Sequence, residues 1–143
     1  MKIGGVLLVF LFFCNFLTSQ TGIGITGGLN MSGNNSEVMV GPFYKNQFSS
    51  RVGFEVEGLF SGANFQPNLL AKLNAYKSLT IQAGANTTIT HRLLSDESLV
   101  VRNGTTGFFI GVGCDFDSNF RFGYRYNLIG FAQLYIGYGF FKD

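Results

Sequence analysis

Apolar residues alternate with small or polar residues along the second half of the chain. In three segments every second position is apolar: Phe108, Ile110, Val112 and Cys114; Phe120, Phe122, Tyr124 and Tyr126; and Leu134, Ile136, Tyr138 and Phe140. The positions between them hold mostly glycines and charged residues, such as Gly111, Gly123 and Arg125. A period of two places successive side chains on opposite faces of a β-strand. The pattern therefore predicts strands with one apolar face and one small or polar face.

A weaker version of this pattern runs through the first half of the chain. Together the two halves predict eight strands, over residues 21–31, 38–45, 51–60, 69–76, 79–92, 108–115, 120–127 and 134–141. Tilted strands of about ten residues cross a bilayer, and bacterial membrane barrels have an even number of strands. We therefore predict an all-β fold, an eight-stranded antiparallel up-and-down transmembrane β-barrel whose apolar faces point outward.

Composition changes this picture little. The chain has 17 Phe and 20 Gly, and after residue 19 it has no apolar run long enough for a transmembrane helix. A membrane barrel needs no large apolar core, because its apolar face points to lipid. The alternative is a soluble lipocalin-like barrel that binds an apolar ligand, in which the aromatic residues would point inward and Glu57 and Arg125 outward.

The N-terminus has the pattern of an export signal. Met1 and Lys2 precede a short apolar run, residues 3–17, and then the small polar residues Thr18 and Ser19. The run is too short for a membrane span, so we predict a secretory signal peptide over residues 1–19 and a single β-barrel domain over residues 20–143. An uncleaved anchor helix is the alternative. Cleavage leaves Cys114 as the single cysteine, which excludes a disulfide within the mature chain.

The predicted inner face combines small and charged residues. Its glycines suit the small interior of a narrow barrel: Gly24, Gly28, Gly41, Gly53, Gly84, Gly111, Gly113, Gly123, Gly137 and Gly139. Its charged residues have nearly balanced signs: Glu55, Glu57, Lys72, Arg121 and Arg125. Buried charges must be paired, so we predict a structural salt-bridge network in the lumen, with Glu57 opposite Lys72 across one hairpin. A proton or ion path, or a small pore, is the alternative.

The connections between the predicted strands differ in length. Those around 46–50, 76–78 and 117–119 are tight, 127–132 is intermediate, and 32–37, 61–68 and 94–105 are longer and more polar. Short turns of such barrels face the periplasm and long loops face the outside, so we expect periplasmic termini and extracellular loops. Pro42 lies within a predicted strand and cannot donate a ladder hydrogen bond, which indicates a bulge or a lipid-facing irregularity there.

The sequence offers little for catalysis or cofactors. His91, the one histidine, precedes Ser95, Asp96 and Glu97, but no strained turn holds a nucleophile against it, so we expect that the protein is not an enzyme. A lipid-modifying enzyme that uses His91 is the alternative. No Cys and His cluster could bind zinc, and Gly22-Ile23-Gly24 and Gly111-Val112-Gly113 lie within strands rather than before a helix. The net charge is +2, and no basic patch indicates nucleic acid. We therefore expect no cofactor, no metal and no nucleic-acid partner.

The last strand carries a further signal. Leu134, Ile136, Gly137, Tyr138 and Phe140 form a terminal strand of alternating apolar residues with glycine between them. This segment is similar to the C-terminal strand that the barrel-assembly machinery recognises. An ordinary amphipathic strand is the alternative interpretation.

The order of these segments resembles a known family, the PorT-type outer-membrane β-barrel domain, which is related in shape to the OmpX and OmpA barrels. The similar stretches are residues 40–44, 54–61, 81–84, 109–113, 125–127 and 135–140. By this resemblance, Glu57, Lys72 and Arg125 match inward-facing charged positions of the family.

The resemblance implies an integral outer-membrane protein of a Gram-negative cell. The expected role is non-enzymatic, either structural in the envelope or in surface interaction, with an accessory barrel of a secretion or motility system as the alternative. The implied partners are outer-membrane lipid and lipopolysaccharide, and periplasmic chaperones and the barrel-assembly machinery during biogenesis. We expect a monomer.

Overall fold

A computed structural model of the chain describes residues 20–62, 64–93, 99–102, 106–116 and 119–142. These residues form the strands β1 (Gln20–Ser32), β2 (Asn35–Gln47), β3 (Val52–Ser61), β4 (Asn64–Tyr76), β5 (Leu79–Thr87), β6 (Ile89–Leu93), β7 (Leu99–Arg102), β8 (Thr106–Phe116), β9 (Phe120–Asn127) and β10 (Phe131–Lys142). Within these ranges, no helix is long and apolar enough to cross a membrane. The predicted signal peptide, residues 1–19, lies outside the described residues.

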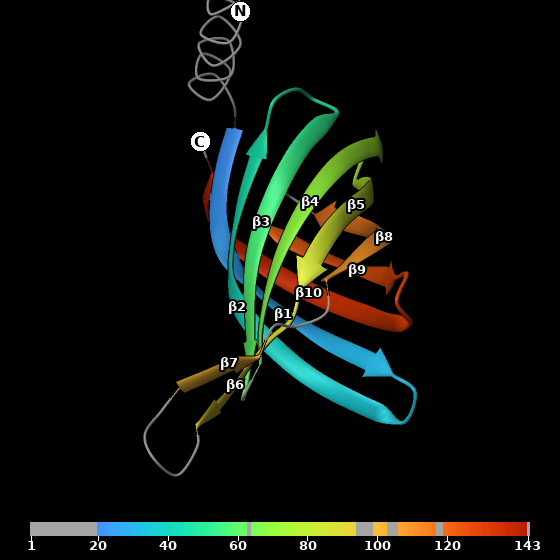
Figure 1. The fold of residues 1–143 in the computed structure, drawn as a ribbon. Coiled ribbons are helices and arrows are strands. Elements are labelled where there is room, and N and C mark those ends of the chain that lie inside the picture. Colours follow the sequence, from blue (N-terminus) through green and yellow to red (C-terminus); the bar gives the residue numbers. More distant parts are fainter. Residues whose placement is uncertain (1–19, 63, 94–98, 103–105, 117–118, 143) are drawn as a thin grey trace, which may run out of the picture.

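Eight of the described strands close into an antiparallel barrel (Figure 1). Around the ring, the order is β1, β2, β3, β4, β5, β8, β9 and β10, and β10 pairs with β1 to complete it. Consecutive strands of the ring are joined by connections that run from one strand to its neighbour, as in an up-and-down barrel. The predicted eight-stranded barrel is therefore confirmed.

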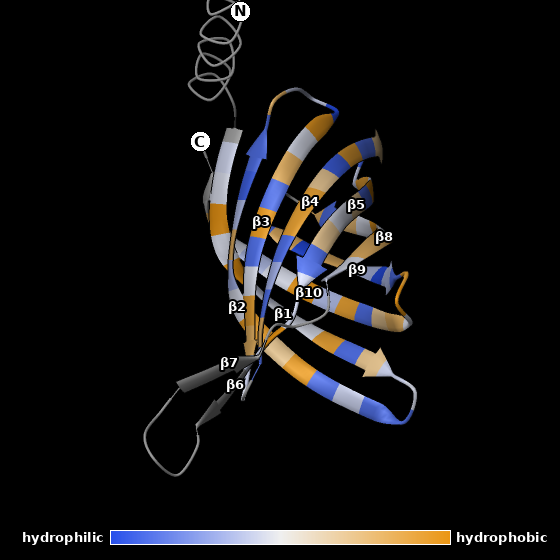
Figure 2. Cartoon of the chain, in the orientation of Figure 1, coloured by the Kyte–Doolittle hydropathy of each residue, from blue (hydrophilic) through white to orange (hydrophobic). Residues whose placement is uncertain are grey.

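The barrel wall separates apolar from polar side chains. The apolar positions of β9 are 42–46 % exposed, whereas Arg121 and Arg125 between them are 3 % and 2 % exposed. Apolar and polar residues alternate along the other wall strands in the same way (Figure 2). The reversed arrangement required for a lipocalin-like protein, with Glu57 and Arg125 outside, is thus wrong for this chain.

The predicted fifth strand over residues 79–92 is wrong, because it is two strands. β5 ends at Thr87, and β6 begins at Ile89 and continues along the same edge of β4, with Ile89 opposite Phe65. β6 then pairs with β7, so the predicted loop over 94–105 contains a strand. The β6–β7 hairpin extends beyond the ring at the end opposite the termini (Figure 1). The period of two continues through Thr88, so alternation alone could not show that the strand leaves the barrel wall.

Two predicted long connections are tight turns. β1 ends at Ser32 and β2 begins at Asn35, and β3 ends at Ser61 and β4 begins at Asn64, so each connection is only two residues long. Gly33 and Gly62 have φ of 55° and 29°, a left-handed conformation that glycine adopts without steric cost. Polar residues such as Ser36 and Gln66, which the prediction assigned to loops, are therefore paired within β2 and β4.

Pro42 interrupts pairing without shifting register. Val40 pairs with Phe60 and Phe43 pairs with Glu57, so the two strands keep one register on both sides of the gap. Pro42 is exposed on the outer face and still lies opposite Ile25 of β1. It is an irregularity on the outer face rather than a bulge. Pro67, which the prediction left outside its strand, lies inside β4 opposite Gly58.

Candidate functional site

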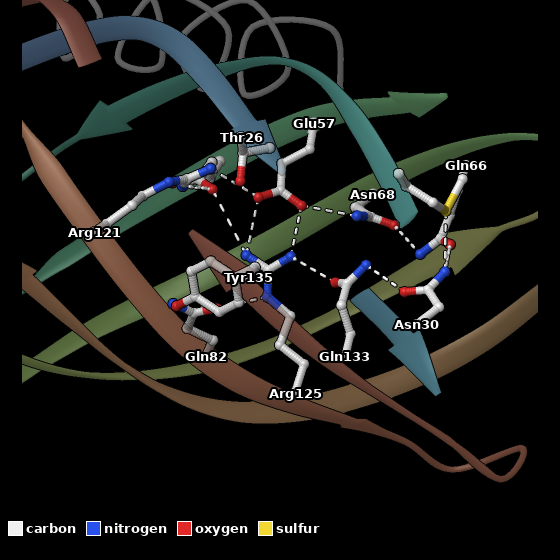
Figure 3. A network of polar contacts seen from close by, with 12 residues as sticks. Thr26, Asn30, Glu57, Gln66, Asn68, Gln82, Arg121, Arg125, Gln133 and Tyr135 are labelled. Carbon is white, nitrogen blue, oxygen red and sulfur yellow. Dashed lines mark hydrogen bonds and ion pairs between the residues drawn. The ribbon is translucent and has the colours of Figure 1, made fainter. Parts of the chain in front are cut away.

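Five charged side chains from three strands converge in the barrel lumen. They are Glu55 and Glu57 of β3, Lys72 of β4, and Arg121 and Arg125 of β9, here called the lumen network. Each occupies an inward position of its strand, and none is more than 7 % exposed. β3 and β9 lie on opposite sides of the ring, so the network joins distant parts of the wall (Figure 3).

Glu57 is at the centre of the lumen network. Its carboxylate accepts hydrogen bonds from Arg125 Nη1 at 2.6 Å and Arg125 Nη2 at 2.9 Å, a two-point contact. Arg121 Nη2 donates at 2.9 Å and Asn68 Nδ2 at 2.8 Å. Such bidentate, charge-assisted hydrogen bonds are among the strongest in proteins. One carboxylate thus binds both guanidinium groups that β9 directs into the lumen.

Glu55 extends the lumen network toward the end of the barrel that holds the termini. It pairs with Arg121 Nη1 and with Lys72 Nζ, the latter at 3.4 Å. Lys72 Nζ also contacts Asp115 Oδ2 of β8 at 3.0 Å. Asp115 was not among the predicted network residues, although it shares the inward parity of Gly111 and Gly113, and this parity could have identified it.

The predicted ion pair between Glu57 and Lys72 is wrong. Glu57 lies opposite Asn68 in the β3–β4 ladder, and Lys72 lies opposite Gly53. The prediction placed the centre of the hairpin within a long loop over residues 61–68. Because the turn is only two residues long, Lys72 lies four residues further along the ladder and pairs with Glu55 instead.

Aromatic rings cover the arginines of the lumen network. The guanidinium carbon of Arg121 lies 3.6 Å from the ring centre of Phe43, and that of Arg125 lies 3.9 Å from the ring centre of Tyr135. Tyr135 also accepts a hydrogen bond from Gln82. The rings interact with the positive charges while they exclude water, which strengthens the ion pairs around them.

A set of amide side chains continues the network toward the other end of the barrel. Arg125 Nη1 donates to Gln133, Gln133 donates to Asn30, Asn30 donates to Gln66, and Gln66 donates to Asn68. Asn68 and Arg125 both donate to Glu57, so these hydrogen bonds form a closed ring (Figure 3). The sequence prediction missed these amides, since it considered only charged residues, although Gln133 has the same parity as Tyr135.

The arrangement fits a packed interior better than a path for protons or ions. Among the described side chains, Met39, Phe43, Leu59, Leu70, Phe109 and Tyr135 are buried and apolar. Among the described residues of the lumen network and its neighbour Asp115, two buried polar side-chain atoms lack a hydrogen-bond partner, Arg121 Nε and Asp115 Oδ1. Arginine is not deprotonated in proteins, so Arg121 and Arg125 cannot relay a proton. The geometry therefore favours a structural network.

The other sequence-predicted residues lie away from the lumen network. The backbone of His91 is in β6, outside the ring, and its side chain lies outside the described residues, as do Ser95, Asp96 and Glu97. In the described part of the chain, no group of His, Cys, Asp and Glu residues could hold a metal ion. Cys114 is half-buried in β8. Leu134, Ile136, Tyr138 and Phe140 point outward from β10, whereas Gly137 faces the lumen.

Several solved structures have a fold similar to that of this chain. The N-terminal β-barrel domain of OprF from Pseudomonas aeruginosa is similar over 85 % of this chain and 99 % of that domain, with a TM-score of 0.57 and 16 % sequence identity. The chain has the fold of small outer-membrane β-barrels. Neither a protein-family model nor a curated protein matches it in sequence.

Two further solved barrels share this fold. Ail, the attachment invasion locus protein of Yersinia pestis, is 11 % identical, with 85 % of this chain and 97 % of Ail covered and a TM-score of 0.50. Neisserial surface protein A, NspA, is 16 % identical, with 83 % of this chain and 94 % of NspA covered and a TM-score of 0.50. At these identities the likeness concerns the fold and not the task.

Proposed function

We propose that this protein is a non-enzymatic, monomeric integral protein of the outer membrane with a structural or surface-interaction role. The observation that carries the proposal is the distribution of side chains across the barrel wall. Aromatic and aliphatic side chains cover the outside, and the charged groups are paired inside. A wall of this kind is stable in lipid and would be poorly soluble in water. The PorT-type resemblance of its strands agrees with this location.

The direct test is to fractionate cells and compare gel migration with and without boiling. We expect the protein in the outer-membrane fraction, with faster migration before boiling, because a closed barrel stays folded in detergent until it is heated. A soluble β-rich protein of the periplasm would contradict the proposal. Recovery with the membrane but no heat-dependent migration would indicate peripheral attachment and would also contradict it.

The proposed orientation places the termini in the periplasm and the β6–β7 hairpin at the cell surface. The turns at the end that holds the termini are short, whereas the connection from β5 to β8 at the opposite end contains the hairpin. Thr90 Oγ1 of β6 donates a hydrogen bond to Asn64 Oδ1 of β4 at 2.9 Å, which ties the hairpin to the barrel wall. A surface-interaction role would depend on this hairpin, since long extracellular segments carry recognition in such barrels.

The C-terminal strand supports a proposal about biogenesis. β10 closes the ring by pairing with β1 over ten residue pairs, from Gly22 with Lys142 to Met31 with Ala132. Its outward residues Leu134, Ile136, Tyr138 and Phe140 form an apolar row that assembly machinery could contact before closure. We therefore propose that periplasmic chaperones and the barrel-assembly machinery recognise this strand, and that lipid and lipopolysaccharide surround the wall afterwards.

A closed lumen predicts no ion conduction. The lumen network and the surrounding buried side chains occupy the middle of the barrel, so ions would have to break several buried ion pairs to pass. We expect purified protein to show no stable current steps in a planar bilayer. A double variant with Glu57→Ser and Arg125→Ser shortens two of these side chains and serves as the comparison. Steady channels in the unchanged protein would favour the pore alternative.

A further inference from the structure

Two adjacent apolar depressions lie on the outer wall of the barrel. Two cavities of about 200 and 360 Å³ share Phe122, Gly123 and Leu134 as lining residues. Their remaining lining residues come from both neighbouring sides: Leu79, Val112, Gly113, Cys114 and Tyr124 on one, and Gly27, Gly28, Leu29, Val38, Tyr135 and Ile136 on the other. The two depressions are therefore neighbours, and together they span six strands and are called the trough here.

The strand registers explain the shape of the trough. Its floor is the backbone of four residues that are direct partners in successive ladders: Gly113, Gly123, Tyr135 and Gly28. The side chains at these positions point inward or are absent. On the inner side, the Tyr135 ring backs this floor, because a Cβ added to Gly123 would lie 2.7 Å from Tyr135 Cε1. The wall is therefore thin here, with a ring inside and a depression outside.

Two rows of outward side chains border the floor. One row contains Val112, Tyr124, Leu134, Leu29 and Val38, which follow each other in the ladders. The other row contains Cys114, Phe122 and Ile136, and it ends at Gly27, which has no side chain. A Cβ added to Gly27 would meet its nearest neighbour, Met39 O, only at 3.7 Å. The gap at Gly27 is thus open space on the outer face and widens the trough.

We propose that this trough binds one hydrocarbon chain of a membrane phospholipid. The inference rests on the proposed membrane location. The floor crosses β9 and β10 near their middles, away from both ends of the barrel, so in a membrane the trough opens to the hydrocarbon layer. No charged or amide side chain lines it. A long, narrow and apolar depression is filled well by a flexible alkyl chain, whereas the convex wall of another barrel would bridge it and leave the floor uncovered.

The test measures lipid binding to protein recovered from outer membranes and transferred to detergent micelles. Dipalmitoyl phosphatidylethanolamine is titrated, and bound lipid is counted by native mass spectrometry. We expect one lipid to be retained preferentially by the unchanged protein. Gly27→Leu should weaken this binding about tenfold, because its side chain fills the trough. Ala83→Leu adds a leucine to an exposed position of β5 outside the trough and should bind as the unchanged protein does.

A second measurement locates the bound chain in vesicles. A phosphatidylethanolamine with a photoreactive group in the middle of its acyl chain should label β9 and β10 more than β3 and β4, and Gly27→Leu should remove this preference. Even labelling around the barrel, equal loss in both leucine variants, or cross-links between copies in place of lipid would each overturn the proposal. Heat-dependent migration of every variant shows that it is folded. A folded outer-membrane barrel without preferential lipid binding would reject the trough alone, whereas a soluble protein would reject the proposed function.

Discussion

Replacing Glu57 with glutamine is expected to lower the free energy of unfolding by about 3 kcal/mol or more, because it removes one partner of buried ion pairs. Glu57 is 1 % exposed and binds both Arg121 and Arg125. Glutamine has nearly the same shape but no charge, so two guanidinium groups would remain buried with Glu55 as their single carboxylate in the lumen network. The amide nitrogen of glutamine also cannot accept the two hydrogen bonds that one Glu57 oxygen accepts, so the measured change reports the lost charge and the lost hydrogen bonds together.

This effect is measured by urea unfolding of the barrel in detergent, with the folded fraction read from gel migration. Glu37→Gln is the matched control. Glu37 accepts hydrogen bonds from Ser61 and Asn64 near the end of the barrel and is only partly buried, so its replacement should cost about 1 kcal/mol. Adding Arg125→Gln to Glu57→Gln should recover part of the loss, because the uncompensated charge is removed. Equal urea midpoints for Glu57→Gln and the unchanged protein would show that the network contributes little to stability.

Replacing Gly41 with alanine is expected to cost about 3 kcal/mol, at the upper end of the range for overpacked sites. A Cβ at Gly41 would collide with the carbonyl oxygen of Gly58 and lie 3.1 Å from Leu59 Cα. Both neighbours are backbone atoms of β3, which cannot move aside as a side chain can. The β2–β3 ladder already has a gap beside Pro42, and the added methyl group would force these strands further apart.

Gly27→Ala is the matched control for this prediction, since the same methyl group there would meet only an ordinary contact at 3.7 Å. Alanine also restricts the unfolded chain, so the control should be neutral or slightly stabilising. Both variants are compared by heat-dependent migration and by urea midpoint. If Gly41→Ala were as stable as Gly27→Ala, the close approach of β2 and β3 at this position would be wrong.

The lumen network shows where prediction from sequence ended. Parity along β3 and β9 was sufficient to place Glu55, Glu57, Arg121 and Arg125 inside, because the side-chain direction in a strand depends only on its local geometry. The partner of each charge depends on register, and register depends on turn length. The prediction made the turn between β3 and β4 too long, and it therefore assigned Lys72 to Glu57, whereas Lys72 pairs with Glu55.

The sequence by itself determined the barrel class, the two faces of its wall and the five charged residues of the lumen network. These features follow from a local period of two and from the requirement that buried charges be paired. The tertiary structure alone decided that β6 leaves the wall at Thr88, that Lys72 pairs with Glu55 and Asp115 rather than with Glu57, and that Gly27 opens a trough on the outer face. Each of these features depends on which residues of different strands become neighbours. Strand pairing and register in the closed barrel determine these neighbours, and the local sequence pattern does not.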